Sequence, residues 1–175
     1  KGIEYFVMLN NLQCIANQLT ELDLSHNTKL TYLNCCENDL TKLDLSKNTE
    51  LNIVNCSGNG LETLDVSGCT ELTVLNCGDN ALTALDVSSC IGLKELYCAY
   101  NKLSALNVGS CADLTRLDCG YNLLTALDVS SNTALSGLAC SCNKLESLDL
   151  SGNTALSVLN CGFQLTGGTA YWDGD

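Results

Sequence analysis

Leucine residues recur along the chain at spacings that repeat in two slightly different halves. From Leu30 to Asn48, the motif L-x-x-L-x-C-x-x-N is followed, after one residue, by L-x-x-L-x-L-x-x-N. The full unit of 21 residues reads L-x-x-L-x-C-x-x-N-x-L-x-x-L-D-[LV]-S-x-[NC]-x-x. Seven complete copies occupy residues 9–155, and an eighth copy loses the pattern after Cys161. Repetition at a fixed period predicts a solenoid in which each copy forms one coil.

Each half of the repeat is only ten or eleven residues long. A helix alone needs about 10–12 residues, so neither half has room for a strand and a helix. The alternating L-x-[CL] and L-x-[LV] segments instead predict a short strand in each half, with every second side chain inward. The predicted fold class is a mainly β repeat solenoid of about eight coils, with short parallel strands and little or no helix.

Asparagine and cysteine also recur at the 21-residue step. The asparagines are Asn17, Asn38, Asn59, Asn80, Asn101, Asn122 and Asn143, followed by Gln164. We expect their side chains to turn into the coil and form a hydrogen-bonded ladder with the backbone of a turn. In the second half of the repeat, the equivalent asparagine is replaced by Cys69, Cys90 and Cys111.

The cysteine ladder of the first half consists of Cys14, Cys35, Cys56, Cys77, Cys98, Cys119, Cys140 and Cys161. Stacked strands lie about 4.8 Å apart, whereas the Cβ atoms of a disulfide lie about 3.8 Å apart with converging directions. Most of the 13 cysteines are therefore expected to be buried free thiols that pack as small apolar groups. The sequence has no C-x2-C pair, so we predict no metal site.

The stretch LTYLNCCENDLTKLDLSKNTE, residues 30–50, resembles a leucine-rich repeat of the short, nested 21-residue bacterial class, the IRREKO type. The resemblance covers nearly the whole chain and extends broadly to internalin-like surface arrays. It implies a leucine-rich repeat array that holds a partner, and a secreted or cell-surface location. The many free thiols would instead suit a reducing compartment, so the location stays open at this point.

The repeat boundaries divide the chain into three segments. We expect a degraded N-terminal cap at residues 1–8, the leucine-rich repeat solenoid at residues 9–166, and a C-terminal cap or the start of a linker at residues 167–175. Caps are expected because one coil alone buries too little apolar surface to fold, and the end coils lack a neighbour.

Composition removes several classes of partner. The chain has 20 acidic against 8 basic residues and a formal net charge of −12, which repels phosphate and argues against nucleic acid. No run approaches the roughly 18 apolar residues of a membrane span, so membrane insertion is not expected. We expect a monomer without a cofactor.

Catalytic chemistry has little support in the sequence. His26 is the only histidine, and its place in the turn Ser25-His26-Asn27 favours a solvated side chain over a general base. The sequence also lacks G-x-S-x-G, H-E-x-x-H and phosphate-loop motifs. We therefore predict that the chain is not an enzyme.

A second column is acidic and is followed two residues later by serine in most copies. Its members are Asp23, Asp44, Asp65, Asp86, Asn107, Asp128 and Asp149. We interpret this column as a solvated face. A calcium- or ice-binding regular face is the less favoured alternative, because the G-G-x-G-x-D signature is absent and Glu62 and Glu146 interrupt the threonine column.

The outward positions of the first strand vary from copy to copy, which favours recognition there. Copies five and six place tyrosines beside charged residues, and tyrosine and arginine dominate binding hot spots. The candidate partner-binding residues are Glu95, Tyr97, Tyr100, Arg116, Asp118 and Tyr121, together with Tyr32. The predicted function is a non-catalytic module that binds a protein or glycan partner. The alternative is a structural spacer that carries another domain of a larger protein.

Overall fold

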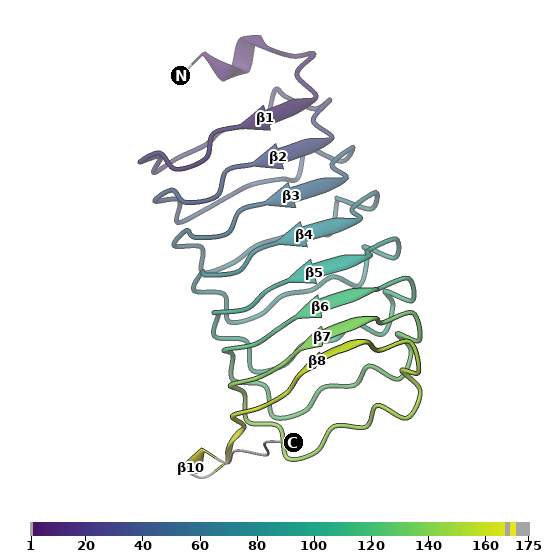
Figure 1. The fold of residues 1–175 in the computed structure, drawn as a ribbon. Helices are drawn as coiled ribbons and strands as arrows, with labels where there is room; N and C mark the ends of the chain where they lie inside the picture. Colours follow the sequence, from purple (N-terminus) through teal and green to yellow (C-terminus); the bar gives the residue numbers. More distant parts are fainter. Residues whose placement is uncertain (1, 167–168, 171–175) are drawn as a thin grey trace.

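The computed structural model describes residues 2–166 and 169–170 and shows a solenoid of stacked coils (Figure 1). Eight three-residue strands run parallel in one sheet whose strand order follows the sequence. They are β1 Asn11–Gln13, β2 Tyr32–Asn34, β3 Ile53–Asn55, β4 Val74–Asn76, β5 Glu95–Tyr97, β6 Arg116–Asp118, β7 Gly137–Ala139 and β8 Val158–Asn160. We number the coils by their strands.

Neighbouring strands pair without any shift in the repeat register. Leu33 of β2 lies opposite Val54 of β3, and Leu96 of β5 lies opposite Leu117 of β6. Each equivalent residue therefore stacks directly on the one 21 positions earlier, as the sequence period predicts. The predicted mainly β, parallel leucine-rich repeat solenoid is confirmed.

The second half of each repeat forms no strand within the described residues, so the prediction of two strands per coil is wrong. In coil 2, the Asp44 carboxylate accepts a hydrogen bond from the Ser46 N–H at 2.9 Å, and the Asn48 N–H donates to the Leu45 carbonyl at 2.9 Å. These backbone donors are satisfied inside their own coil, whereas a parallel ladder needs donors that point to the neighbouring coil. The inward residues Leu43 and Leu45 are nevertheless buried.

The core is a continuous column of leucine, valine and cysteine side chains inside the coils. Leu33, Cys35 and Leu40 of coil 2 are fully buried, as are their equivalents in coils 3 to 6. Burial of one such leucine contributes about 2 kcal/mol, so the roughly six inward side chains of one coil do not offset the entropy of ordering its 21 residues. Stability therefore comes from stacking each coil on the next.

The first asparagine ladder joins successive coils as predicted. The Asn38 amide nitrogen donates to the carbonyls of Cys14 in coil 1 and Cys35 in coil 2, at 2.9 and 3.0 Å. Its amide oxygen accepts a hydrogen bond from the Leu19 N–H at 3.1 Å. Each ladder asparagine thus satisfies backbone groups that a corner would otherwise leave unpaired.

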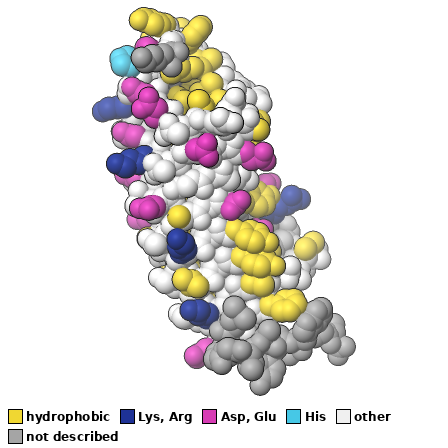
Figure 2. Space-filling model, turned by 90° about the vertical axis from the view of Figure 1, so that its left-hand side faces the viewer, with side chains coloured by type: hydrophobic (Ala, Val, Ile, Leu, Met, Phe, Trp, Pro, Cys, Tyr) yellow, Lys and Arg dark blue, Asp and Glu magenta, His cyan; other side chains and the backbone are white. Residues whose placement is uncertain are grey.

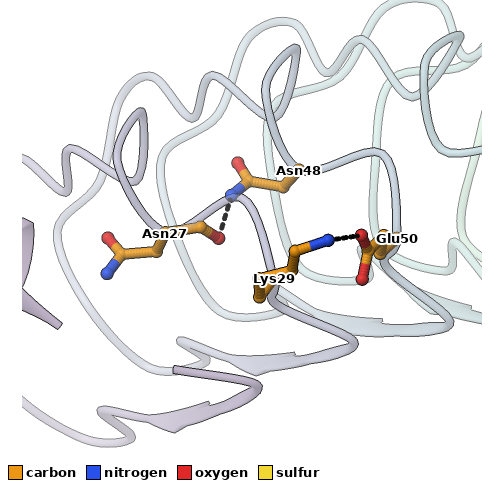
Figure 3. Close-up of polar contacts among 4 residues, drawn as sticks. All are labelled: Asn27, Lys29, Asn48 and Glu50. Carbon is orange, nitrogen blue, oxygen red and sulfur yellow. Dashed lines mark hydrogen bonds and ion pairs between the residues drawn. The ribbon is translucent and has the colours of Figure 1, made fainter. Parts of the chain in front are cut away.

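A second asparagine column lies on the other side of the coil. Figure 3 shows the Asn48 amide directed at the Asn27 carbonyl of the preceding coil, with a distance of 2.9 Å. Nearby, an ion pair between Lys29 and Glu50 bridges the same two coils at the surface. An exposed pair of this kind contributes little stability, so the buried amide is the more important link.

The segment before coil 1 begins with a short 3-10 helix, η1 Ile3–Tyr5. The Asn27 amide donates to the carbonyls of Ile3 and Phe6 at 2.9 and 3.1 Å. In later coils, the equivalent asparagine donates to carbonyls of the preceding coil, as Asn48 does to Leu24 and Asn27. Ile3 and Phe6 take the place of that preceding coil, which supports the proposed cap at residues 1–8. No helix in the described part of the chain is long and apolar enough to span a bilayer.

At the other end, β9 Leu165–Thr166 and β10 Thr169–Ala170 pair as antiparallel strands. The proposed C-terminal cap or linker at residues 167–175 lies outside the described residues except for this short strand β10.

Candidate partner-binding face

The sheet face presents two columns of outward side chains, and we call it the first-strand face. One column precedes the buried strand residue and the other follows it. Glu95 pairs in register with Arg116, and Tyr97 pairs with Asp118. The structure thus brings together four of the predicted site residues on β5 and β6.

Tyr97 links the charged groups of this cluster. Its hydroxyl donates a hydrogen bond to the Glu95 carboxylate at 2.7 Å. Partial burial and the Glu95 carboxylate raise the pKa of Tyr97, so the phenol stays protonated. Contact with the Tyr97 hydroxyl, reinforced by Glu95, raises the pKa of Arg116. The cluster therefore holds a half-buried aromatic ring in place beside an exposed, permanently charged guanidinium.

Tyr100 and Tyr121 stack on each other just beyond the strands. Their ring centroids are 4.2 Å apart and their planes differ by 10°, a parallel stack slightly closer than the roughly 4.5–7 Å usual for aromatic pairs. Both rings remain about half exposed, at 55% and 48%. Figure 2, which looks at the side where the strands end, shows a short run of apolar side chains along one margin of the array.

The tyrosine stack depends on an unusual backbone conformation. Tyr100 and Tyr121 have φ angles of +56° and +52°, in the left-handed region that non-glycine residues rarely adopt. The same position is left-handed in every coil, from Ala16 to Phe163. The corner therefore projects this side chain outward from each coil, and consecutive tyrosines meet face to face.

Tyr32 is not part of this group. It lies on β2, three strands from β5, and at about 4.8 Å per strand this separates it from Tyr97 by roughly 14 Å. The structure therefore brings six of the seven predicted residues into one region and leaves Tyr32 apart.

Sequence reasoning missed a hollow next to the cluster. Gly137 and Ala139 of β7 present almost no side chain on the first-strand face, and the hollow above them has a volume of about 390 Å³. Its walls include Tyr97, Arg116 and Asp118 on one side and Val158 on the other. The sequence did contain a signal. Gly137 is the one glycine, and Ala139 the one alanine, in the two outward columns of the first strand.

The buried ladder cysteines are not activated nucleophiles. All 13 are free thiols, and most are buried. Burial raises the pKa of Cys35, Cys77 and Cys140 to about 12, and only a thiolate would be reactive. Six of the eight ladder cysteines are buried core side chains, in agreement with the prediction for most of them, whereas Cys14 is partly buried and Cys161 is exposed.

The acidic column has a local structural role. Each carboxylate accepts a hydrogen bond from the backbone N–H two residues later, at 2.9 Å for Asp65 and Ser67. These hydrogen bonds lower the pKa of the aspartates. Within the described residues, no group of three or more histidine, cysteine, aspartate or glutamate side chains is arranged to hold a metal ion.

Comparisons with known proteins agree with this architecture. A family model for the leucine-rich repeat matches residues 17–33 and 141–157. The functional domain of InlJ from Listeria monocytogenes, which includes a cysteine ladder, is 38% identical with a TM-score of 0.76. That match covers 93% of this chain and 41% of the InlJ chain. No curated protein sequence matches the chain significantly.

Two further solved structures share the fold. An internalin, inlF, from Listeria monocytogenes is 24% identical with a TM-score of 0.80, over 83% of this chain and 45% of that one. A leucine-rich repeat protein from Leptospira interrogans is 23% identical with a TM-score of 0.78, over 92% of this chain and 50% of that one. The chain thus spans half or less of the length of these three relatives.

Proposed function

We propose that this internalin-like leucine-rich repeat array is a non-catalytic recognition module that binds a protein partner through the first-strand face of coils 5 and 6. The observation that carries the proposal is the exposed stack of Tyr100 and Tyr121 beside the Tyr97 cluster. Tyrosines that are already ordered lose little side-chain entropy on binding, and such residues commonly act as hot spots.

The distribution of aromatic residues favours recognition over a spacer role. Only six tyrosines occur in the chain, and three of them lie on coils 5 and 6. A spacer needs the buried ladders alone, and it gains nothing from half-exposed rings. The Asp column, by contrast, repeats with little variation and is explained by the turns that it stabilises.

Charge and relatives both support a protein partner. The net charge of −12 disfavours nucleic acid and other polyanions. The internalin-like relatives have a fold that generally serves protein interaction, and the present chain spans only part of each of them. A secreted or cell-surface location and a monomeric state form part of this proposal.

The test compares two pairs of substitutions on opposite sides of the coil. After a partner has been isolated from a cell-surface extract and purified, its affinity is measured for Tyr97→Ala with Tyr121→Ala, and for Asp44→Asn with Asp65→Asn. Truncation of hot-spot tyrosines typically costs 2 kcal/mol or more, so we expect the tyrosine pair to weaken binding at least about 30-fold. Loss of binding in the aspartate pair alone would place the interface on the other side.

A glycan partner remains the second candidate, since tyrosine rings also pack against sugar rings. Binding of a purified glycan to the array, with no protein ligand found for the same face, would favour this candidate.

A further inference from the structure

We infer that the hollow over β7 receives one bulky apolar side chain of the protein partner, adjacent to a lysine or arginine on the same partner segment. The inference rests on the proposed function, because it specifies the partner chemistry that the same face would recognise. Three features support it: the shape of the hollow, the hydrogen bonds already made by its serine hydroxyls, and the charges on its walls.

The shape results from two missing side chains. β7 offers only Gly137 and Ala139 on the first-strand face, whereas the neighbouring strands offer Arg116, Asp118 and Val158. A Cβ atom added to Gly137 would meet no atom nearer than the Arg116 Cγ at 3.8 Å. The floor is therefore open to an incoming group, and its volume of about 390 Å³ accommodates a leucine or phenylalanine side chain.

The lining favours an apolar group over a sugar ring. The floor is formed by Gly137 and Ala139, and the wall on the β8 side by Val158 and Asn160. The hydroxyls at one end are engaged, because Ser136 donates to the Thr115 carbonyl at 3.0 Å and Ser157 donates to the Ser136 carbonyl at 3.1 Å. A sugar presents several hydroxyls that each need a polar partner when buried, whereas both serines have committed their donor protons and Asn160 supplies a single amide.

The charges at the walls are not equivalent. Arg116 already interacts with the Tyr97 hydroxyl, and the nearby Glu95 carboxylate attracts its positive charge. The Asp118 carboxylate accepts a hydrogen bond from the Gly120 N–H at 3.1 Å, and no cation of the described chain lies within ion-pair distance of it. A cationic partner residue would complement Asp118 as well as the overall charge of −12.

A peptide titration followed by ¹H–¹⁵N NMR tests the inference directly. The probe is the capped peptide Gly-Gly-Phe-Lys-Gly-Gly, and the comparison peptides replace Phe by Ala or Lys by Glu. Methyl α-D-glucopyranoside serves as the sugar probe. We expect shift changes centred on residues 116–118, 137–139 and 158–160, with a dissociation constant on the order of millimolar. The Ala peptide should bind about tenfold more weakly, and the Glu peptide about threefold more weakly.

Variants of the array identify the binding position. Gly137→Val fills the hollow and should abolish the shifts, and valine is compatible with the strand because Val74 occupies the same register position on β4. Asp118→Asn should remove the preference for Lys over Glu. Val74→Ile alters the same column three coils away and should change nothing. Thermal melts establish that each variant is folded.

Three results would overturn the inference. They are equal binding to Gly137→Val, shifts produced by the sugar but not by the peptide, and no shifts with any peptide at about 10 mM. None of these results bears on the tyrosine substitutions tested with a full partner. Loss of binding in the tyrosine pair, with full binding by Gly137→Val, would retain the proposed function and reject the hollow.

Discussion

The thiol of Cys111 and the side-chain amide of Asn132 occupy equivalent places in successive coils. The Cys111 thiol donates to the carbonyls of Val87 and Cys90 at 3.8 and 3.6 Å, and the Asn132 amide donates to those of Val108 and Cys111 at 3.0 and 2.8 Å. The two side chains thus make the same pair of connections with different strengths. This equivalence explains why cysteine replaces asparagine at this corner in coils 3 to 5.

The first prediction concerns the side-chain amide oxygen in the second asparagine column. The Asn132 amide oxygen is buried without a hydrogen-bond partner in the described structure, and such a group costs about 1–3 kcal/mol. Asn132→Cys removes this oxygen and keeps the donor, so we expect the free energy of unfolding to change by less than about 1 kcal/mol. Urea unfolding measures it.

Asn122→Cys provides the matched control. The Asn122 oxygen accepts a hydrogen bond from the Leu103 N–H at 2.9 Å, and its nitrogen donates to three carbonyls, including that of Cys98 at 3.0 Å. Its loss leaves a buried N–H unpaired, and we expect destabilisation by about 2 kcal/mol or more. Equal effects of the two substitutions would contradict this account of the ladders.

The repeat period and the inward positions allowed the strands of the first half to be predicted from sequence, because each buried residue is dictated by its neighbours in the stack. The second half was predicted as a strand because Leu43 and Leu45 alternate like strand residues. The competing signal was Asp44 followed by Ser46, since aspartate captures the serine N–H in a turn. The sequence period indicates which side chains point inward, but it does not indicate which acceptors the backbone N–H groups bind.

The candidate site was only partly accessible to the same reasoning. The closeness of Tyr100 and Tyr121 follows from the 21-residue step, but their parallel stacking depends on a left-handed corner that the amino-acid types at this position do not indicate. The hollow was missed because it arises from the small size of Gly137 and Ala139 and not from any functional group that they carry.

The second prediction concerns alkaline pH. Burial raises the pKa of Cys35, Cys77 and Cys140 to about 12, whereas an unfolded thiol ionises near about 8.5. Above that pH the unfolded state binds fewer protons than the folded state, so stability is complete below about pH 8.5 and falls as the pH rises toward 12. Each thiol contributes a slope of up to about 1.4 kcal/mol per pH unit.

Urea unfolding at pH 7, 9 and 10 measures this slope. Cys77→Ala lowers stability at every pH, but it should also make the decline between pH 9 and 10 less steep. A stability that stays constant from pH 7 to 10 would show that the thiols ionise in the folded array.

The third prediction concerns the left-handed corner. Asp79 adopts a φ angle of +51°, which costs a non-glycine residue about 1 kcal/mol. Asp79→Gly should therefore raise the free energy of unfolding by about 1 kcal/mol, while Asp79→Ala should give no such gain. Thermal unfolding measures both variants.

Gly58 tests the same corner in the reverse direction. It has a φ angle of +63°, and an added Cβ would lie 3.4 Å from the Glu37 side chain. Gly58→Ala should destabilise the array by about 1 kcal/mol. A gain in stability for this substitution would contradict the assignment of strain to the corner.

The last prediction separates folding from recognition by the removal of whole coils. Deletion of residues 72–92 joins Glu71 to Leu93, and deletion of residues 116–136 joins Thr115 to Gly137. Both joins preserve the 21-residue register, so in a solenoid each remaining coil regains a neighbour of the same kind. Both deletions should therefore give cooperative thermal melts, whereas Leu75→Asp, which buries a charge at a fully buried position, should unfold its surroundings.

Only the second deletion removes Arg116, Asp118 and Tyr121, and it should lose the protein partner that the first deletion retains. Retained binding after the second deletion would place the interface elsewhere on the array.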